Sequence, residues 1–269
     1  MSDIKKLKSF CLAIGLDANA AKLCCDYPLS DKEIISLYEL LCTNADAFFK
    51  LSAQAKDMPL RYLALYVRIA YNLQSEYDKR GIAQKIYIDT FSDISLWEHE
   101  YFSLHNAHGI EEIFWLANHL RLRLFRLGAL QFEPLQAVTY TLPQNAKGLP
   151  IFNVHIPKGA DLSTISTTVA YKAALEFWHY DKAVFVCHSW LLSPALFKLL
   201  PPNSRILSFA SCFNVIETDE SDRQAEERIF GKVLDNPLQY PCDTSLQAAA
   251  REYLISKNLI PSGFGWQII

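Results

Sequence analysis

Two histidines end short apolar stretches in the second half of this 269-residue sequence. Residues 152–156 alternate apolar and polar side chains, as a half-buried strand does, and His155 lies near their end. Residues 183–187 form a second apolar run, which His188 and Ser189 follow. Because imidazole exchanges protons near neutral pH, His155 and His188 are candidate general bases and Ser189 is a candidate acid. The alternative for either histidine is a structural role as a hydrogen-bonded interior group.

Between the two runs the sequence predicts a turn and the start of a helix. The residues of this segment are Pro157, Lys158, Gly159, Ala160, Asp161, Leu162 and Ser163. Glycine suits a tight turn, and Asp and Ser are typical of helix N-termini. Backbone N–H groups at a helix N-terminus have no helical partner and bind anions such as phosphate. The segment is therefore a candidate anion-binding site beside the two histidines.

The elements that position these residues belong to the second of two parts. Residues 1–126 have helical apolar spacing, with a capping box from Ser30 to Glu33 and with Pro59 in the first turn of a long helix. Two further helices are expected over 86–101 and 110–126, and no strand is expected in this part.

After Gly128 the pattern changes to strands separated by helices. The expected strands are 130–135 and 138–142, with Glu133-Pro134 as a break between them, and then 151–156, 183–187, 205–216 and 265–269. Helices are expected over 161–179 and, after a charged helical stretch at 217–228, over 245–257. The sequence thus predicts an α/β (α+β) protein, with a helical N-terminal domain at 1–126 and a mixed-sheet domain at 127–269.

Composition excludes several classes of protein. Hydrophobic residues make up 51% of the chain and its net charge is -3, so a packed globular protein is expected and a nucleic-acid-binding one is not. No stretch approaches the ~20 apolar residues that span a bilayer, and no signal peptide is evident. We therefore expect a cytoplasmic protein that does not bind membranes.

The cysteines do not form a recognisable framework. They are Cys11, Cys24, Cys25, Cys42, Cys187, Cys212 and Cys242, an odd number without regular spacing. Free thiols in a reducing compartment are expected, and no metal site is predicted. Cys187 is not expected to pair with His188, because adjacent residues of a strand point to opposite faces.

Three segments carry a resemblance to a known family. Residues 115–128, His155-Ile156-Pro157 and residues 187–191 resemble a bacterial family of two-domain acyltransferases, in which a helical N-acyltransferase domain precedes a GNAT-like domain. The resemblance implies that coenzyme A or acyl-CoA is the co-substrate, with its pantetheine arm beside strand 151–156 and its pyrophosphate at residues 157–163. It also implies that strand 183–187 splays away from its neighbour and leaves a cleft for the acyl group.

Two functions follow as expectations. The first is transfer of an acyl group from acyl-CoA to the amine of a small molecule, which enters between the two domains. The second is a non-catalytic GNAT-like protein that binds a ligand or partner, because GNAT enzymes have further glycines where this chain has Asp161. A homo-oligomer is compatible with either function.

Overall fold

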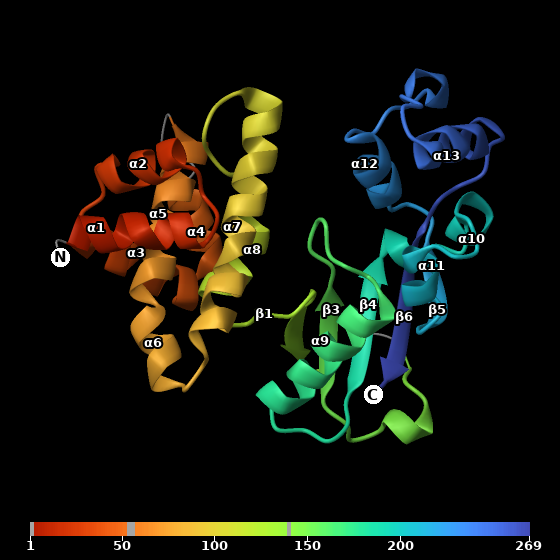
Figure 1. Ribbon diagram of the computed structural model, residues 1–269, viewed down its shortest axis with the longest axis horizontal. Coiled ribbons are helices and arrows are strands. Elements are labelled where there is room, and N and C mark those ends of the chain that lie inside the picture. Colours follow the sequence, from red (N-terminus) through yellow and green to blue (C-terminus); the bar gives the residue numbers. More distant parts are fainter. Residues whose placement is uncertain (1–2, 53–56, 139–140) are drawn as a thin grey trace. The chain divides into compact units, whose positions relative to one another are not determined.

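The computed structural model describes residues 3–52, 57–138 and 141–269 (Figure 1). The chain divides into two compact units, Met1–Leu127 and Gly128–Ile269. The first unit is helical apart from one short strand, and the second combines a mixed sheet with helices. The predicted fold class, a helical part followed by a mixed α/β part, is confirmed.

The first unit is built around one buried helix. Its elements are α1 (Asp3–Ala13), α2 (Ala18–Asp26), α3 (Asp31–Thr43), α4 (Ala45–Ser52), α5 (Met58–Asn72), α6 (Gln74–Lys79), α7 (Gln84–His105), α8 (Ile113–Leu120) and β1 (Phe125–Leu127). Pro59 lies in the first turn of α5, and Ser30 caps α3 by accepting the N–H of Glu33. From the buried α5, Arg68 donates to the carbonyls of Cys24, Tyr27 and Leu29. These bonds satisfy carbonyl groups at the end of α2 and in the connection to α3 that no helical N–H reaches.

The second unit carries most of the sheet. Its elements are β2 (Leu130–Leu135), η1 (Gln144–Ala146), β3 (Ile151–His155), α9 (Thr164–Phe177), β4 (Val184–Ser189), η2 (Trp190–Leu192), α10 (Leu196–Leu199), α11 (Arg205–Ala210), β5 (Asn214–Asp219), α12 (Gln224–Phe230), η3 (Pro237–Gln239), α13 (Ser245–Ile255) and β6 (Ser262–Ile268). The strand order is β1-β2-β3-β4-β6-β5. β3 and β4 are parallel, whereas the β2–β3, β4–β6 and β5–β6 pairs are antiparallel.

Helix α9 lies on one face of the sheet (Figure 1), and aromatic side chains pack it there. Tyr171 of α9 contacts the rings of Phe132 and Phe185 edge-on, and its hydroxyl accepts a hydrogen bond from Gln267. Phe152 stacks on Phe185 within this layer. These residues are buried, so the hydrophobic core of the unit lies between α9 and this face.

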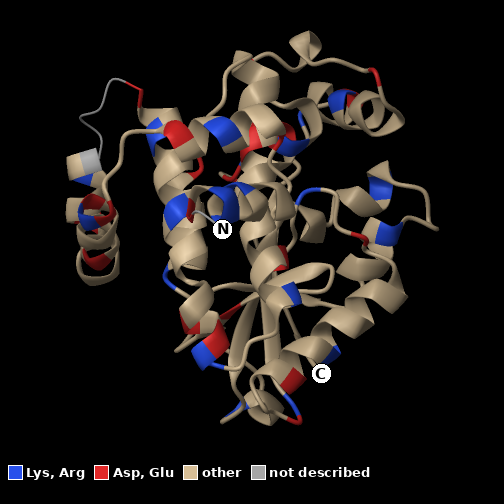
Figure 2. Ribbon diagram, turned by 60° about the vertical axis from the view of Figure 1, so that its left-hand side comes forward, with Lys and Arg blue, Asp and Glu red and all other residues tan. Residues whose placement is uncertain are grey.

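Charges of both signs are interspersed along the ribbon in the view of Figure 2. Among the described residues, no helix is both long and apolar enough to cross a membrane.

One sequence prediction was wrong because a short apolar run suits helix and strand alike. Residues 205–216 are not a single strand. Ser204 accepts the N–H of Ile206 and caps α11, and β5 begins only at Asn214. The helix expected at 110–126 also ends early, because Leu122 adopts a left-handed φ of 54° after α8.

The strands before β3 also differ from expectation. Glu133-Pro134 is not a break: β2 continues through it, with Pro134 opposite Phe152. A proline interrupts only the hydrogen bond that its own nitrogen would donate. The strand expected at 138–142 includes residues 139–140, which lie outside the described residues, and the described Val138, Thr141 and Leu142 are not in a strand.

The backbone at the start of β6 lies so close to η2 that a side chain at Gly263 would not fit. A Cβ atom on Gly263 would lie 2.6 Å from the carbonyl oxygen of Leu192 in η2. We therefore expect Gly263→Ala to lower the free energy of unfolding by about 1–3 kcal/mol, as overpacked positions do. Urea denaturation measures this, with Val169→Ala on the exposed side of α9 as a control that changes stability by less than about 0.5 kcal/mol. Equal stability of the two variants would contradict the close packing of η2 on β6.

Candidate functional site

The two parallel strands of the sheet separate at their C-terminal ends. Their pairing runs from Ile151↔Val184 to Asn153↔Val186 and then stops. Beyond this point β3 stays paired to β2, through Val154 and His155, while Cys187 to Ser189 of β4 stay paired to β6. We call the opening between residues 154–155 and 187–189 the wedge. Along the wedge β3 and β4 are not register partners of each other.

His155 and His188 lie on the same face of the sheet. Asn153 and Val186 are register partners, and each histidine follows its partner by two residues, so the alternation along both strands brings them to one side. At the other end of this face a hydrophobic cluster covers the strands with Ala146, Val184, Val186 and the partly buried residues around them. The polar end of the face thus coincides with the wedge.

His155 is held by a carboxylate on the neighbouring strand. Its Nε2 lies 3.3 Å from Oε2 of Glu133 in β2, and both side chains are partly buried. Sequence analysis did not identify Glu133, because Glu133-Pro134 was interpreted as a break and the pairing of β2 with β3 is seen only in the structure.

His188 is more exposed and has two contacts that fix its ring. The ring stacks on Phe264 of β6 with centroids 3.8 Å apart and planes 5° apart. Its Nε2 lies 3.6 Å from Oδ2 of Asp222, and its side chain is 36% exposed. Among the described residues no hydrogen bond engages its Nδ1, so one ring nitrogen faces a carboxylate and the other is open to accept a proton.

The structure does not bring Ser189 to the two histidines. Ser189 is buried on the opposite face, and its Oγ accepts the N–H of Leu191 at the start of η2. Cys187 shares that face, and burial raises the pKa of its thiol to about 12. A thiol so held is protonated at neutral pH and is a poor nucleophile.

The turn from Pro157 to Ser163 connects the wedge to α9. Ala160 donates its N–H to the carbonyl of Pro157, with Gly159 at a φ of +76°. No atom lies within 4 Å of where a Cβ of Gly159 would be, so a ligand can approach its backbone. Lys158 is exposed and Leu162 is buried beneath the turn.

Asp161 is engaged within this turn. Its carboxylate accepts the N–H and hydroxyl of Ser163 and the hydroxyl of Ser166, and Arg205 of α11 lies 3.1 Å away. These contacts, with the Ser166 hydroxyl first, lower the pKa of Asp161 from 3.8 to about 2. Arg205 therefore offsets the negative charge that the sequence placed in the turn.

Two backbone N–H groups at the start of α9 remain open. Ser163 caps the helix by accepting the N–H of Ser166, but no hydrogen bond to the N–H of Thr164 or Ile165 is found among the described residues. Together with Arg205, these N–H groups form a candidate anion-binding site. Sequence analysis missed Arg205 because it was assigned to a strand; the Ser204 cap was the available signal.

Cavities elsewhere do not contain the histidines. One of ≈ 150 Å³ lies between α9 and α11, lined by Tyr171, Phe209 and Gln267 among others, on the α9 face of the sheet. Another of ≈ 440 Å³ lies in the helical unit beside Tyr38 and Arg80. We assign the site to the wedge, because there open backbone edges and ionisable side chains occur together.

Other histidine–carboxylate contacts lie inside the helical unit. His119 is 3.3 Å from Asp93, whose carboxylate also accepts the indole N–H of Trp115, and His108 is 2.6 Å from Glu98. Their carboxylates are buried, which is typical of structural pairs. Among the described residues no group of three or more His, Cys, Asp or Glu side chains is placed to hold a metal ion.

The bonds to Asp161 predict a pH-dependent contribution to stability. Because its pKa is lower in the folded chain, the contribution is full above about pH 4 and is lost as the pH falls towards 2. We expect Asp161→Asn to lower the urea midpoint at pH 6, with the difference from the unmodified chain shrinking steadily between pH 4 and pH 2. A difference that stays constant over this range would show that the carboxylate does not make these bonds.

Comparisons with known proteins give the family. Residues 5–122 match the N-acyltransferase N-terminal domain, and residues 124–267 match the GNAT-like C-terminal domain. No protein of curated function matches the chain.

Solved structures share the fold. A crystal structure of an acyltransferase in complex with decanoyl-CoA and teicoplanin has 18% sequence identity and a TM-score of 0.75, over 98% of this chain and 88% of that chain. A mutant acyltransferase with octanoyl-CoA has 18% identity and a TM-score of 0.75, over 98% and 87%. A complex of an acyltransferase with CoA and 10C-teicoplanin has 18% identity and a TM-score of 0.74, over 96% and 86%. The two matched domains, in this order, show that the chain belongs to the family of two-domain N-acyltransferases with a GNAT-like C-terminal domain.

Proposed function

We propose that this protein transfers an acyl group from an acyl-CoA thioester to the amine of a small molecule. The observation that carries the proposal is the wedge, with His155 and His188 on one face at its mouth. Membership of the N-acyltransferase family and the fold shared with acyltransferases crystallised with CoA, octanoyl-CoA and decanoyl-CoA support it.

The residues of this chain fit coenzyme A. Beyond Asn153 and Val186, where β3 and β4 no longer pair with each other, their edges offer hydrogen bonds to the two amides of a pantetheine arm. The diphosphate then reaches the turn from Pro157 to Ser163, where Lys158 and the N–H groups of Thr164 and Ile165 attract negative charge. Arg205 pairs with Asp161 and offsets the charge of its carboxylate.

His188 is the base in this proposal. The amine nitrogen attacks the thioester carbonyl carbon, forming the C–N bond, and the C–S bond then breaks to release CoA as its thiolate, which water protonates. Nδ1 of His188 takes the proton that the amine loses, while Asp222 at Nε2 stabilises the charged ring. Open N–H groups along the wedge stabilise the developing oxyanion.

His155 serves a binding role rather than a second base. Its Nε2 is already at hydrogen-bonding distance from Glu133. The two side chains therefore form a polar surface that contacts the amine substrate. Ser189 faces the other side of the sheet, and we propose that it holds the start of η2 and does not donate a proton.

A non-catalytic binding protein is the second candidate. It is favoured by the two N–H groups, of Ser163 and Ser166, that side chains of the turn itself already occupy. Such a protein binds a small metabolite and shows no turnover with any thioester.

Removal of the His188 imidazole tests the function. We expect His188→Gln to lower kcat by about 10²–10⁴-fold, the usual contribution of a general base, and to leave the Kd for decanoyl-CoA unchanged. Release of the CoA thiol, measured with a thiol reagent across an amine panel, reports turnover, and calorimetry reports binding.

His179→Asn is the matched control. His179 lies after α9 at a left-handed φ of 58° that Asn also adopts, and it is exposed. The control is expected to retain full turnover. Binding of no acyl-CoA by the unmodified chain would favour the non-catalytic candidate, and full turnover by His188→Gln would contradict the assignment of the base.

A further inference from the structure

The side chain of His188 is bounded by groups from three segments. Phe264 of β6 lies flat against the ring, and Asp222, just before α12, faces Nε2. Asp219 at the end of β5 contributes negative charge nearby, and Glu217 of β5 lies opposite Phe264 in the register. Of these carboxylates, Asp222 is the one in ion-pair contact with the ring.

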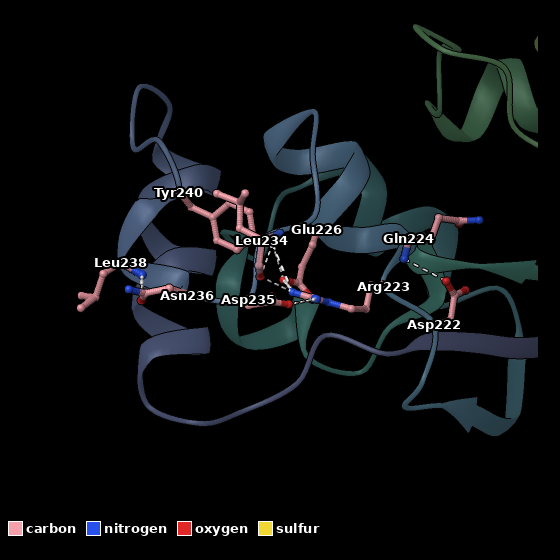
Figure 3. A network of polar contacts seen from close by, with 9 residues as sticks. All are labelled: Asp222, Arg223, Gln224, Glu226, Leu234, Asp235, Asn236, Leu238 and Tyr240. Atoms are coloured by element: carbon pink, nitrogen blue, oxygen red, sulfur yellow. Dashed lines mark hydrogen bonds and ion pairs between the residues drawn. The ribbon is translucent and has the colours of Figure 1, made fainter. Parts of the chain in front are cut away.

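The two oxygens of Asp222 have different partners. Its Oδ1 accepts the backbone N–H of Gln224 at 2.9 Å (Figure 3). Its Oδ2 is the oxygen that lies 3.6 Å from Nε2 of His188. Asp219, by contrast, turns back on its own loop, where its Oδ1 accepts both the N–H and the hydroxyl of Ser221. Only Asp222 is therefore oriented towards the ring by its own hydrogen bond.

Gln224 attaches the same segment to the end of β4. Its side-chain oxygen accepts the N–H of Trp190, two residues after His188. Asp222 and Gln224 thus contact the chain on both sides of Ser189, so residues 222–224 and the end of β4 are joined at two points.

The residue between them anchors the segment to the 231–240 loop (Figure 3). Arg223 binds both oxygens of Glu226 at 2.8 and 2.6 Å, and donates to the carbonyl of Leu234. The Tyr240 hydroxyl donates to Glu226 at 2.6 Å and accepts the N–H of Leu234. Although burial raises it, hydrogen bonds from Arg223 and Tyr240 hold the pKa of Glu226 below its ordinary value.

Two residues of this network are buried, and one of its contacts is bidentate. Glu226 is 7% and Tyr240 2% exposed, and a bidentate Arg–carboxylate pair fixes both orientation and distance. The ring of Phe230 stacks on that of Tyr240, with centroids 4.0 Å apart, and covers the apolar side of the network. Because Arg223 is the neighbour of Asp222 in sequence, the network restricts where the Asp222 carboxylate can lie.

We propose that Asp222 is a positioning residue for His188, and that the Arg223–Glu226–Tyr240 network holds it in place. Asp222 keeps the Nε2–H form of the ring, so the lone pair of Nδ1 faces the amine, and it stabilises the imidazolium once the proton has moved. The proposal rests on the function proposed above, in which His188 is the base.

The contact between Asp222 and His188 can be tested without measuring turnover, from the tautomer of the His188 ring. In ¹⁵N spectra of the full chain, with the His188 signals assigned by their loss in His188→Gln, we expect the Nε2–H form in the unmodified chain. Asp222→Asn is expected to give a mixture of both tautomers, and Asp219→Asn, the matched removal of one nearby charge, to keep the Nε2–H form. An unchanged tautomer in Asp222→Asn would overturn the proposal.

Kinetics test the consequence. We expect Asp222→Asn to lower kcat about 10- to 100-fold with an unchanged KM for acyl-CoA, because the ring loses the carboxylate that orients it. Asp222→Glu should restore part of the rate. Tyr240→Phe should lower kcat less than Asp222→Asn does, and should also give a mixture of both His188 tautomers. His179→Asn is expected to keep the unmodified rate.

The two possible failures differ in their results. Full turnover in both His188→Gln and Asp222→Asn, with a mixed tautomer in Asp222→Asn, would overturn the catalytic role of His188 while leaving the contact established. Lost turnover in His188→Gln with full turnover in Asp222→Asn would overturn the positioning role and leave the base in place.

Discussion

The site depends on one constraint in the sheet: β3 and β4 pair over only three residues and then follow different neighbours. β3 is held by β2 as far as His155, and β4 is held by β6 as far as Ser189. Each strand thus keeps a partner on its outer side while their inner edges separate. Backbone groups that a continuous sheet would use internally become available to a ligand.

The remaining features follow from keeping this opening ordered. Gly263 lets η2 pack on β6, which fixes the chain after β4, and Phe264 supports the ring of His188. The insert between β5 and β6 brings Asp222 to that ring, and the bidentate contact of Arg223 with the buried Glu226 anchors the insert. Such a bidentate pair fixes the orientation of both side chains.

The sequence predicted the fold class, the strands that end near His155 and His188, and α9 after its Asp–Ser start. Apolar alternation and capping residues are local signals, so they can be recognised without knowledge of the tertiary structure. The charged partners Glu133, Asp222 and Arg205 were not predicted. Each meets its partner through strand pairing or an insert far along the chain, and α11 was concealed by an apolar run that suits a strand equally well.

A crystal structure of the chain with decanoyl-CoA tests the central claim most directly. The account predicts the pantetheine arm between residues 154–155 of β3 and 187–189 of β4, the diphosphate at Thr164 and Arg205, and the thioester beside Nδ1 of His188. A ligand bound in the ≈ 150 Å³ cavity between α9 and α11, with the wedge closed by pairing of the two strands, would contradict it.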